Sequence, residues 1–266
     1  TMINDKYISP DWIGTARAEI EGAIGSAPAM YVQGFCGDVN CHHIFGTPAQ
    51  ARSTGLRLGK AAVEALPTLI PARATPFAVR TETIQIDCRP MYTHPELDHA
   101  LKLRRDYIDS LATDPAATWF AGINAPEFMN AKEKTAFVQV QIDYLEEGQR
   151  ILETGESVRD QLDFELTAVR MGDVAAIMSY GENFTQTGAK IRHRSPFAHT
   201  LICGDSNGLW GYLGDDDEID RRGYETDSYW KMLFTDGFRR APAKGSVDRV
   251  IDTSVRMLWD LQEHKG

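Results

Sequence analysis

Three segments of the chain concentrate residue types that could do chemistry. The first, residues 33–43, combines two glycines, an acid, an amide, two thiols and two imidazoles. Gly34 and Gly37 permit close backbone approach, so that amide N–H groups could face a ligand oxygen. The Asp38 carboxylate could orient a neighbouring group by hydrogen bonding. This loop is therefore the first candidate site, and the alternative interpretation is a tight turn that Asp38 caps.

The thiols and imidazoles of this loop suggest two further interpretations, zinc binding and nucleophilic catalysis. Thiolate and imidazole are common zinc ligands, but adjacent histidines generally point in different directions, and the sequence has no second close pair of cysteines. The Cys41 thiol has no evident base. We therefore expect buried thiols and a surface histidine rather than a metal site built from Cys36, Cys41, His42 and His43.

The second and third segments each carry residues that suit a hydrolytic site. In residues 179–185, Glu182 follows an apolar run, where a carboxylate could ligate a metal or accept a proton. Its alternative role is to cap a helix expected to begin near Phe184. Residues 207–225 hold Tyr212 and Tyr224, which taken alone are packing aromatics with a polar tip.

Hydrophobic periodicity predicts the elements that must position these segments. Helical spacing, capping residues and proline or glycine stops predict helices, whereas short apolar runs and strict alternation predict strands, including a hairpin through Met171-Gly172-Asp173. The expected helices span about 11–24, 48–66, 95–112, 129–153 and 246–262, and the expected strands 29–32, 77–87, 162–167, 174–178 and 199–203. This pattern predicts an α+β fold with mixed or antiparallel sheets covered by helices, for which a layered αββα arrangement is one solution.

Composition narrows the class of protein. The 266 residues are 42% hydrophobic and 25% charged, which is typical of a globular protein and favours one domain over residues 1–266. The formal charge of −10 disfavours a nucleic-acid partner. No apolar run is long enough for a membrane span. Four cysteines do not decide the cellular compartment.

Taken in order, these segments resemble the catalytic domain of the neutral/alkaline non-lysosomal ceramidase family, a group of zinc-dependent amide hydrolases. The resemblance covers most of residues 7–225, with the middle poorly matched. It runs through Ile8–Asp11, Gly37–Asn40, Gly181–Thr185, Gly211–Tyr212 and Arg222–Glu225. It implies an amidohydrolase-like activity on a small molecule.

The resemblance also implies roles for single residues. Glu182 and Tyr212 would ligate zinc, and Tyr224 would contact the reacting group. Asn40 and Cys41 depart from the family, which carries a serine and a proline there, so cleavage of ceramide itself is not expected.

The histidine ligands of the family would fall upstream of Thr1. We therefore expect the chain to be the C-terminal portion of a ceramidase-like catalytic domain, with the upstream fragment of the same precursor bound as a second subunit.

A break before Thr1 could itself supply a nucleophile. An N-terminal threonine can attack a carbonyl with its own α-amino group as base, since the pKa of that amine is about 8. Asn40 and amides near Gly37 would then form the oxyanion hole, while Gly37 and Asp38 bind substrate. Thr1 could equally mark an arbitrary cut. The alternative function is a noncatalytic binding or scaffold subunit.

Overall fold

The computed structural model describes residues 8–25, 27–42, 46–120, 123–208, 210–227, 229 and 237–263. Its helices and strands confirm the α+β class. The chain divides into two compact units. Unit 1 comprises Thr1–Glu82, Glu165–Trp210 and Ile251–Gly266, and unit 2 comprises Thr83–Phe164 and Gly211–Val250. That both units form one catalytic domain stays a prediction.

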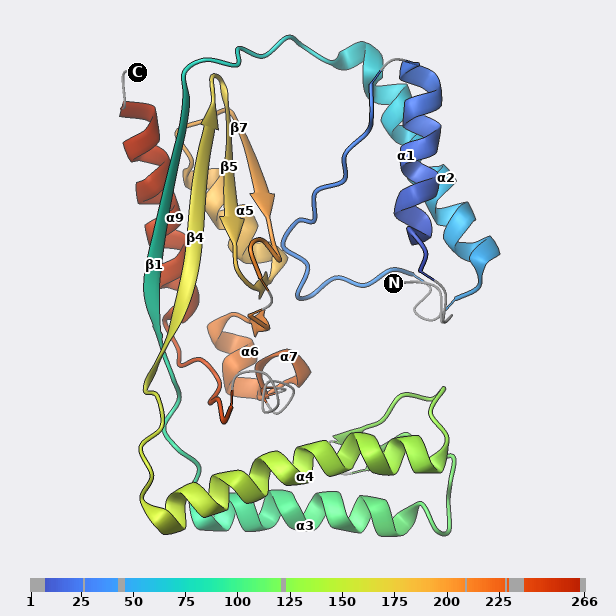
Figure 1. Ribbon diagram of the computed structural model, residues 1–266, viewed down its shortest axis with the longest axis vertical. Helices are drawn as coiled ribbons and strands as arrows, with labels where there is room; N and C mark the ends of the chain where they lie inside the picture. The colour runs from blue at the N-terminus through green and yellow to red at the C-terminus, as the bar shows by residue number, and fades with distance from the viewer. Residues whose placement is uncertain are drawn as a thin grey trace. The chain divides into compact units, whose positions relative to one another are not determined.

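A four-stranded sheet in the order β1-β4-β5-β7 lies mostly in unit 1, with one end each of β1 and β4 belonging to unit 2 (Figure 1). Its strands are β1 (Phe77–Asp87), β4 (Gln161–Met171), β5 (Val174–Ser179) and β7 (His199–Cys203). β4 and β5 form the predicted antiparallel hairpin, with Met171 opposite Val174. β7 runs parallel to β5, with Val174 opposite His199, so the sheet is mixed.

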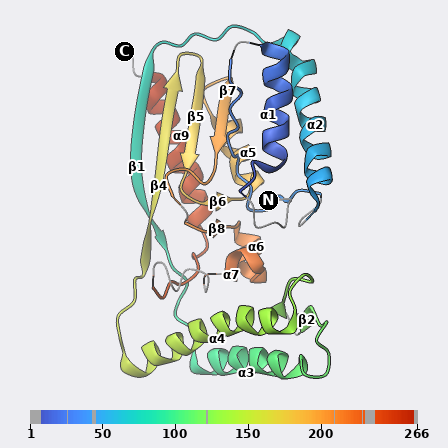
Figure 2. The ribbon, with the colours of Figure 1, turned by 45° about the vertical axis from the view of Figure 1, so that its right-hand side comes forward.

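Helices α5 (Thr185–Arg194) and α9 (Ser246–Glu263) lie against one face of this sheet (Figures 1 and 2). The apolar residues of α9 recur every three or four positions, which places them on one stripe of the helix. Those buried in the core are Val247, Val250, Ile251, Val255, Met257, Leu258 and Leu261. Ion pairs join the edge strand to the other side of α9, where Arg80 and Arg256 both contact Asp260.

The turn between β4 and β5 needs its glycine. Gly172 has a φ of 59°, and a Cβ there would lie 1.9 Å from the Arg73 carbonyl oxygen. A side chain at this position would therefore be both strained and in collision. The Arg73 guanidinium in turn pairs with Asp173 at 2.7 Å, which fixes the linker before β1 against the hairpin.

Unit 1 also contains the helical hairpin of α1 (Asp11–Ile24) and α2 (Pro48–Ala65), followed by a 3-10 turn η1 (Leu66–Thr68). Glycines let the two helices approach closely, because a Cβ on Gly55 would lie 2.3 Å from the Trp12 carbonyl oxygen. The predicted strand at 29–32 is wrong. Met30 and Val32 are 88% and 52% exposed, and the segment joins no sheet. An apolar run forms a strand only where a ladder partner exists, and here Ala29 bonds to Glu21 of α1 instead.

Unit 2 is built on two long helices that lie side by side, α3 (His94–Ser110) and α4 (Ala131–Thr154) (Figures 1 and 2). Each begins with a capping box, in which side chains and backbone N–H groups exchange hydrogen bonds. A core of buried apolar side chains joins them, among them Leu97, Leu101, Tyr107, Val138 and Ile142. None of the helices in the described part of the chain has the length and apolarity needed to cross a membrane.

The remaining elements are short. β2 (Trp119–Phe120) pairs with β3 (Ile123–Asn124) in unit 2, which also holds β8 (Tyr212–Leu213), α6 (Asp216–Arg221) and α7 (Tyr224–Asp227). Unit 1 holds β6 (Glu182–Asn183), directly before α5.

Candidate functional site

The 33–43 loop and the Glu182 segment (residues 179–185) meet in unit 1. The Gly37 N–H donates to the Asn183 carbonyl at 3.0 Å. A Cβ on Gly37 would lie 2.5 Å from the Glu182 carbonyl oxygen and 2.9 Å from the Phe184 ring. Only glycine permits this approach. The amide expected to face a ligand oxygen is therefore engaged within the protein, and Gly37 positions the two segments.

Asp38 connects the two segments through its carboxylate. Its Oδ1 accepts from the Thr185 N–H at 2.7 Å, and its Oδ2 accepts from the Thr185 hydroxyl at 2.8 Å. Thr185 is the first residue of α5, and Phe184 at the N-cap provides no side-chain acceptor. A carboxylate at a helix N-terminus is also favoured by the helix dipole. Asp38 therefore caps α5 through the Thr185 N–H, a role that the sequence also allowed for Glu182.

Asn183 is the buried centre of the Glu182 segment. Its side-chain nitrogen donates to the Ser179 hydroxyl at 2.5 Å and to the Gly181 carbonyl at 3.2 Å. Its side-chain oxygen is buried and has no hydrogen-bond partner in the protein. Buried polar atoms almost always have a partner, so this oxygen is an unusual feature of the segment.

The Cys36 thiol lies among acids. It donates to the Asp205 carboxylate at a sulfur–oxygen distance of 3.6 Å. Burial, followed by the charges of Asp205 and Glu182, raises the pKa of Cys36 to about 12. The thiol is therefore neutral near pH 7 and a poor nucleophile, because the thiolate is the reactive form.

The other members of this loop are less informative. Cys41 is half-buried, His42 and Asn40 are exposed, and His43 lies outside the described residues. Among the residues that the structure describes, no three His, Cys, Asp or Glu side chains form a group that could hold a metal. Zinc thus does not fit a site built from those residues alone.

The two tyrosines named from the sequence meet in unit 2. The rings of Tyr212 and Tyr224 have centroids 5.8 Å apart and meet edge to face at 61°. Behind them, the buried Tyr229 hydroxyl donates to the Tyr212 carbonyl. Tyr224 is 55% exposed, so a phenol of this pair faces solvent.

The turn before Tyr224 positions its ring beside that of Tyr212. Asp215 caps α6 by accepting from the Glu218 N–H at 3.0 Å. Arg222 ends α6 in the left-handed conformation, and a Cβ on Gly223 would lie 1.7 Å from the Glu218 carboxylate. The chain therefore has to reverse tightly here, directly before Tyr224.

Gly37, Asp38 and Glu182 meet in unit 1, and Tyr212 and Tyr224 meet in unit 2. Thr1 lies outside the described residues. The sequence reasoning missed Asp205, which has a positive φ of 48°. The run Gly204-Asp205-Ser206-Asn207-Gly208 is rich in turn-forming residues and is the signal that could have found it.

Comparisons with known proteins extend these observations. No family model matches the chain, and no curated protein matches it. Its fold is similar to neutral ceramidase from Pseudomonas aeruginosa, with a TM-score of 0.53 and 15% identity over 97% of this chain and 42% of that one. It is also similar to a ceramidase complexed with C2, with a TM-score of 0.56, 15% identity and coverage of 97% and 43%. The chain therefore spans less than half the length of both structures, and its fold is similar to that part of a ceramidase.

Proposed function

We propose that this chain is part of a hydrolase that cleaves an amide or related C–N bond of a small molecule. The observation that carries the proposal is the junction of Gly37 and Asp38 with the Glu182 segment. Two segments with the residue types of a hydrolytic site are held together there. Only glycine fits at Gly37, and the Asp38 carboxylate accepts two hydrogen bonds from Thr185. The ceramidase-like fold supports the same reaction class.

In one version of the proposal, Thr1 is the nucleophile. Its Oγ attacks the substrate carbonyl carbon while its α-amino group takes the hydroxyl proton. The amine then returns that proton to the leaving nitrogen as the C–N bond breaks, and water hydrolyses the resulting ester. The exposed Asn40 side chain would donate to the oxyanion, and Tyr224 would orient the substrate.

In the other version, Glu182 and Tyr212 contribute to a zinc site whose remaining ligands are histidines of an upstream fragment. Zinc would activate water and polarise the carbonyl. The described residues do not form a zinc site on their own. This version requires the upstream fragment as a second subunit.

The test uses protein expressed from the full gene and a panel of small N-acyl amines. N-terminal sequencing of the purified material shows whether a chain begins at Thr1, and intact-mass analysis shows whether a second chain ends directly before it. A loss of turnover in Thr1→Ala but not in Glu182→Gln supports the threonine version. A loss in Glu182→Gln, together with stoichiometric zinc that the variant lacks, supports the metal version.

The matched control is Glu156→Gln, which removes an exposed acid of unit 2 that pairs with Arg150. It should leave turnover unchanged. Absence of turnover for the whole panel, in wild type and variants alike, would overturn the proposal and favour a noncatalytic binding or scaffold subunit.

A further inference from the structure

A small pocket in unit 2 has the chemistry of an anion site. Its volume is about 290 Å³, and its lining includes the guanidinium groups of Arg89, Arg222 and Arg240. Glu96 is the acidic lining residue. A pocket of this size suits a small molecule or one polar group of a larger one.

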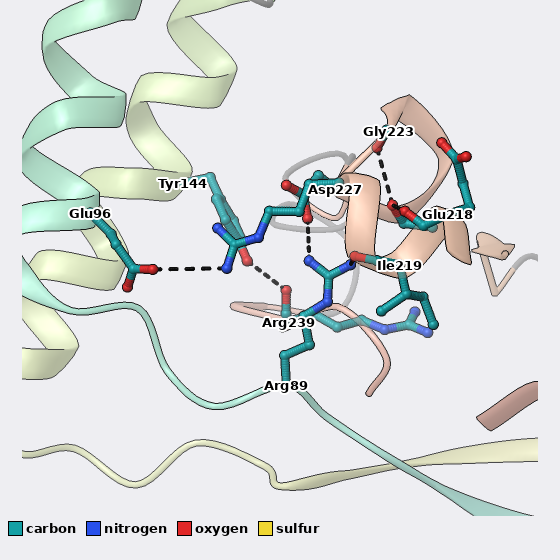
Figure 3. Close-up of polar contacts among 10 residues, drawn as sticks. Arg89, Glu96, Tyr144, Glu218, Ile219, Gly223, Asp227 and Arg239 are labelled. Carbon is teal, nitrogen blue, oxygen red and sulfur yellow. Dashed lines mark hydrogen bonds and ion pairs between the residues drawn. The ribbon is translucent and has the colours of Figure 1, made fainter. Parts of the chain in front are cut away.

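Two of the three arginines are held rigidly by the protein. Arg89 donates to Asp227 at 2.6 Å and to the Ile219 carbonyl at 2.9 Å (Figure 3). Arg240 donates to the Arg89 carbonyl at 3.0 Å and to the Arg159 carbonyl at 2.7 Å, and it also pairs with Asp160. Their charges are thus largely matched by Asp227 and Asp160.

One hydrogen-bond donor of Arg240 lacks an acceptor. Arg240 is only 6% exposed, and its Nε has no hydrogen-bond partner in the protein. A buried donor without an acceptor is unfavourable, and guanidinium N–H groups form their strongest bonds with carboxylate or phosphate oxygens. Arg240 also lines the pocket, so an oxyanion bound there is a candidate acceptor for this donor.

Arg222 supplies the second donor. Its guanidinium is 3.8 Å from the Glu96 carboxylate, which exceeds hydrogen-bond distance, and its side chain is 51% exposed. The other oxygen of Glu96 accepts from the Thr93 N–H and hydroxyl in the capping box of α3. Glu96 is thus committed to the helix, and Arg222 can bond to a ligand.

The backbone conformation of Arg222 is a second indication that its side chain binds a ligand. It has φ 55° and ψ 50°, the left-handed conformation that glycine adopts readily and other residues rarely do. Strained residues of this kind cluster at ligand sites. An arginine in this conformation makes the turn less stable than glycine would, so a role for its guanidinium is one reason for arginine at this position.

We propose that the pocket lined by Arg89, Arg222 and Arg240 binds the carboxylate or phosphate group of a small molecule. The ligand oxygens would accept from Arg240 Nε and from the Arg222 guanidinium. This inference is independent of the proposed hydrolase function, because it concerns binding and uses residues to which that proposal gives no role.

The decisive variant is Arg222→Gly. It removes the guanidinium and relieves the left-handed backbone, so the protein should fold at least as well as wild type. The matched control is Arg221→Gln on the neighbouring residue, whose exposed guanidinium contacts Glu218 and does not line the pocket.

Inorganic phosphate and succinate are titrated separately into the full chain at constant ionic strength by isothermal titration calorimetry. We expect saturable binding of at least one anion, weakened about tenfold or more in Arg222→Gly and within about twofold of wild type in Arg221→Gln. The anion that binds identifies the ligand group. The proposal is overturned if neither anion saturates by about 10 mM, if Arg222→Gly binds like wild type, or if Arg221→Gln loses as much affinity.

Discussion

Helices α3 and α4 begin in a different way from α5. Thr93 and Glu96 cap α3 within four residues of each other, and Asn130 and Glu133 do the same for α4. The first N–H of α5 is instead bound by Asp38, which lies 147 residues earlier in the chain. A local capping box stabilises its helix wherever that helix is placed, whereas the distant cap exists only when two segments have been assembled.

This difference separates stability from function. The caps of α3 and α4 hold the ends of structural helices. The Asp38 cap holds the 33–43 loop against the Glu182 segment, which carries the proposed site. Sequence changes in the local caps should therefore affect one helix, and changes in the distant cap should affect the site.

Gly37→Ala should have the largest effect on the assembled junction. The new methyl group would lie 2.5 Å from the Glu182 carbonyl oxygen, so backbone has to move, at a cost of about 2–3 kcal/mol in the free energy of unfolding. Urea denaturation measures this change. The control is Gly34→Ala, whose Cβ would lie 3.7 Å from the Ile202 carbonyl oxygen, an ordinary contact. Equal stability of the two variants would show that the segments do not approach as described.

Asp38→Ala should come next. It removes both acceptors of Thr185 and the favourable charge at the start of α5, which together contribute about 1–2 kcal/mol. Hydrogen exchange should become faster in the first turn of α5. A double-mutant cycle with Thr185→Ala should give a coupling energy of about 1 kcal/mol. Strictly additive losses would mean that the two side chains do not interact.

Thr93→Ala tests the local capping box of α3. Loss of one capping side chain should lower the free energy of unfolding by about 1 kcal/mol. The change should appear in the amide exchange of α3 and leave the exchange of α5 as in wild type. Faster exchange in α5 would contradict the distinction between the two kinds of cap.

The smallest expected effect is on the titration of Glu96. The Thr93 backbone N–H, and then the Thr93 hydroxyl, hold the pKa of Glu96 below its ordinary value of 4.5. A lowered pKa means that the capping contribution is complete above pH 4.5 and is lost as the pH falls through the folded-state pKa. Carboxyl NMR titration should show a pKa closer to 4.5 in Thr93→Ala. An unchanged pKa in that variant would exclude the Thr93 hydroxyl as a cause, because the variant keeps the backbone N–H.

Features set by neighbouring residues were predictable from the sequence. The hairpin of β4 and β5 follows from alternating burial through Leu162, Phe164 and Leu166 and a glycine turn, and both signals lie within a few residues. The helices were predicted to within a few residues at most ends for the same reason. The α+β class, which the structure confirms, follows from these local patterns.

Features set by distant partners were not predictable. The apolar run at 29–32 has the composition of a strand but lacks a ladder partner, and nothing local reveals that. The parallel pairing of β7 with β5 depends on the path through α5. Likewise, the sequence marks Asp38 and Thr185 as polar residues, but only the fold brings them together.

The bond between Asp38 and Thr185 closes a loop of 147 residues. Chain entropy opposes such a closure by about 4 kcal/mol, more than the hydrogen bonds themselves return. The contact thus forms late, once the surrounding core has already restricted the chain. The Thr185 amide should therefore become protected from hydrogen exchange late in folding. The first amides of α3 and α4, whose caps are local, can become protected earlier.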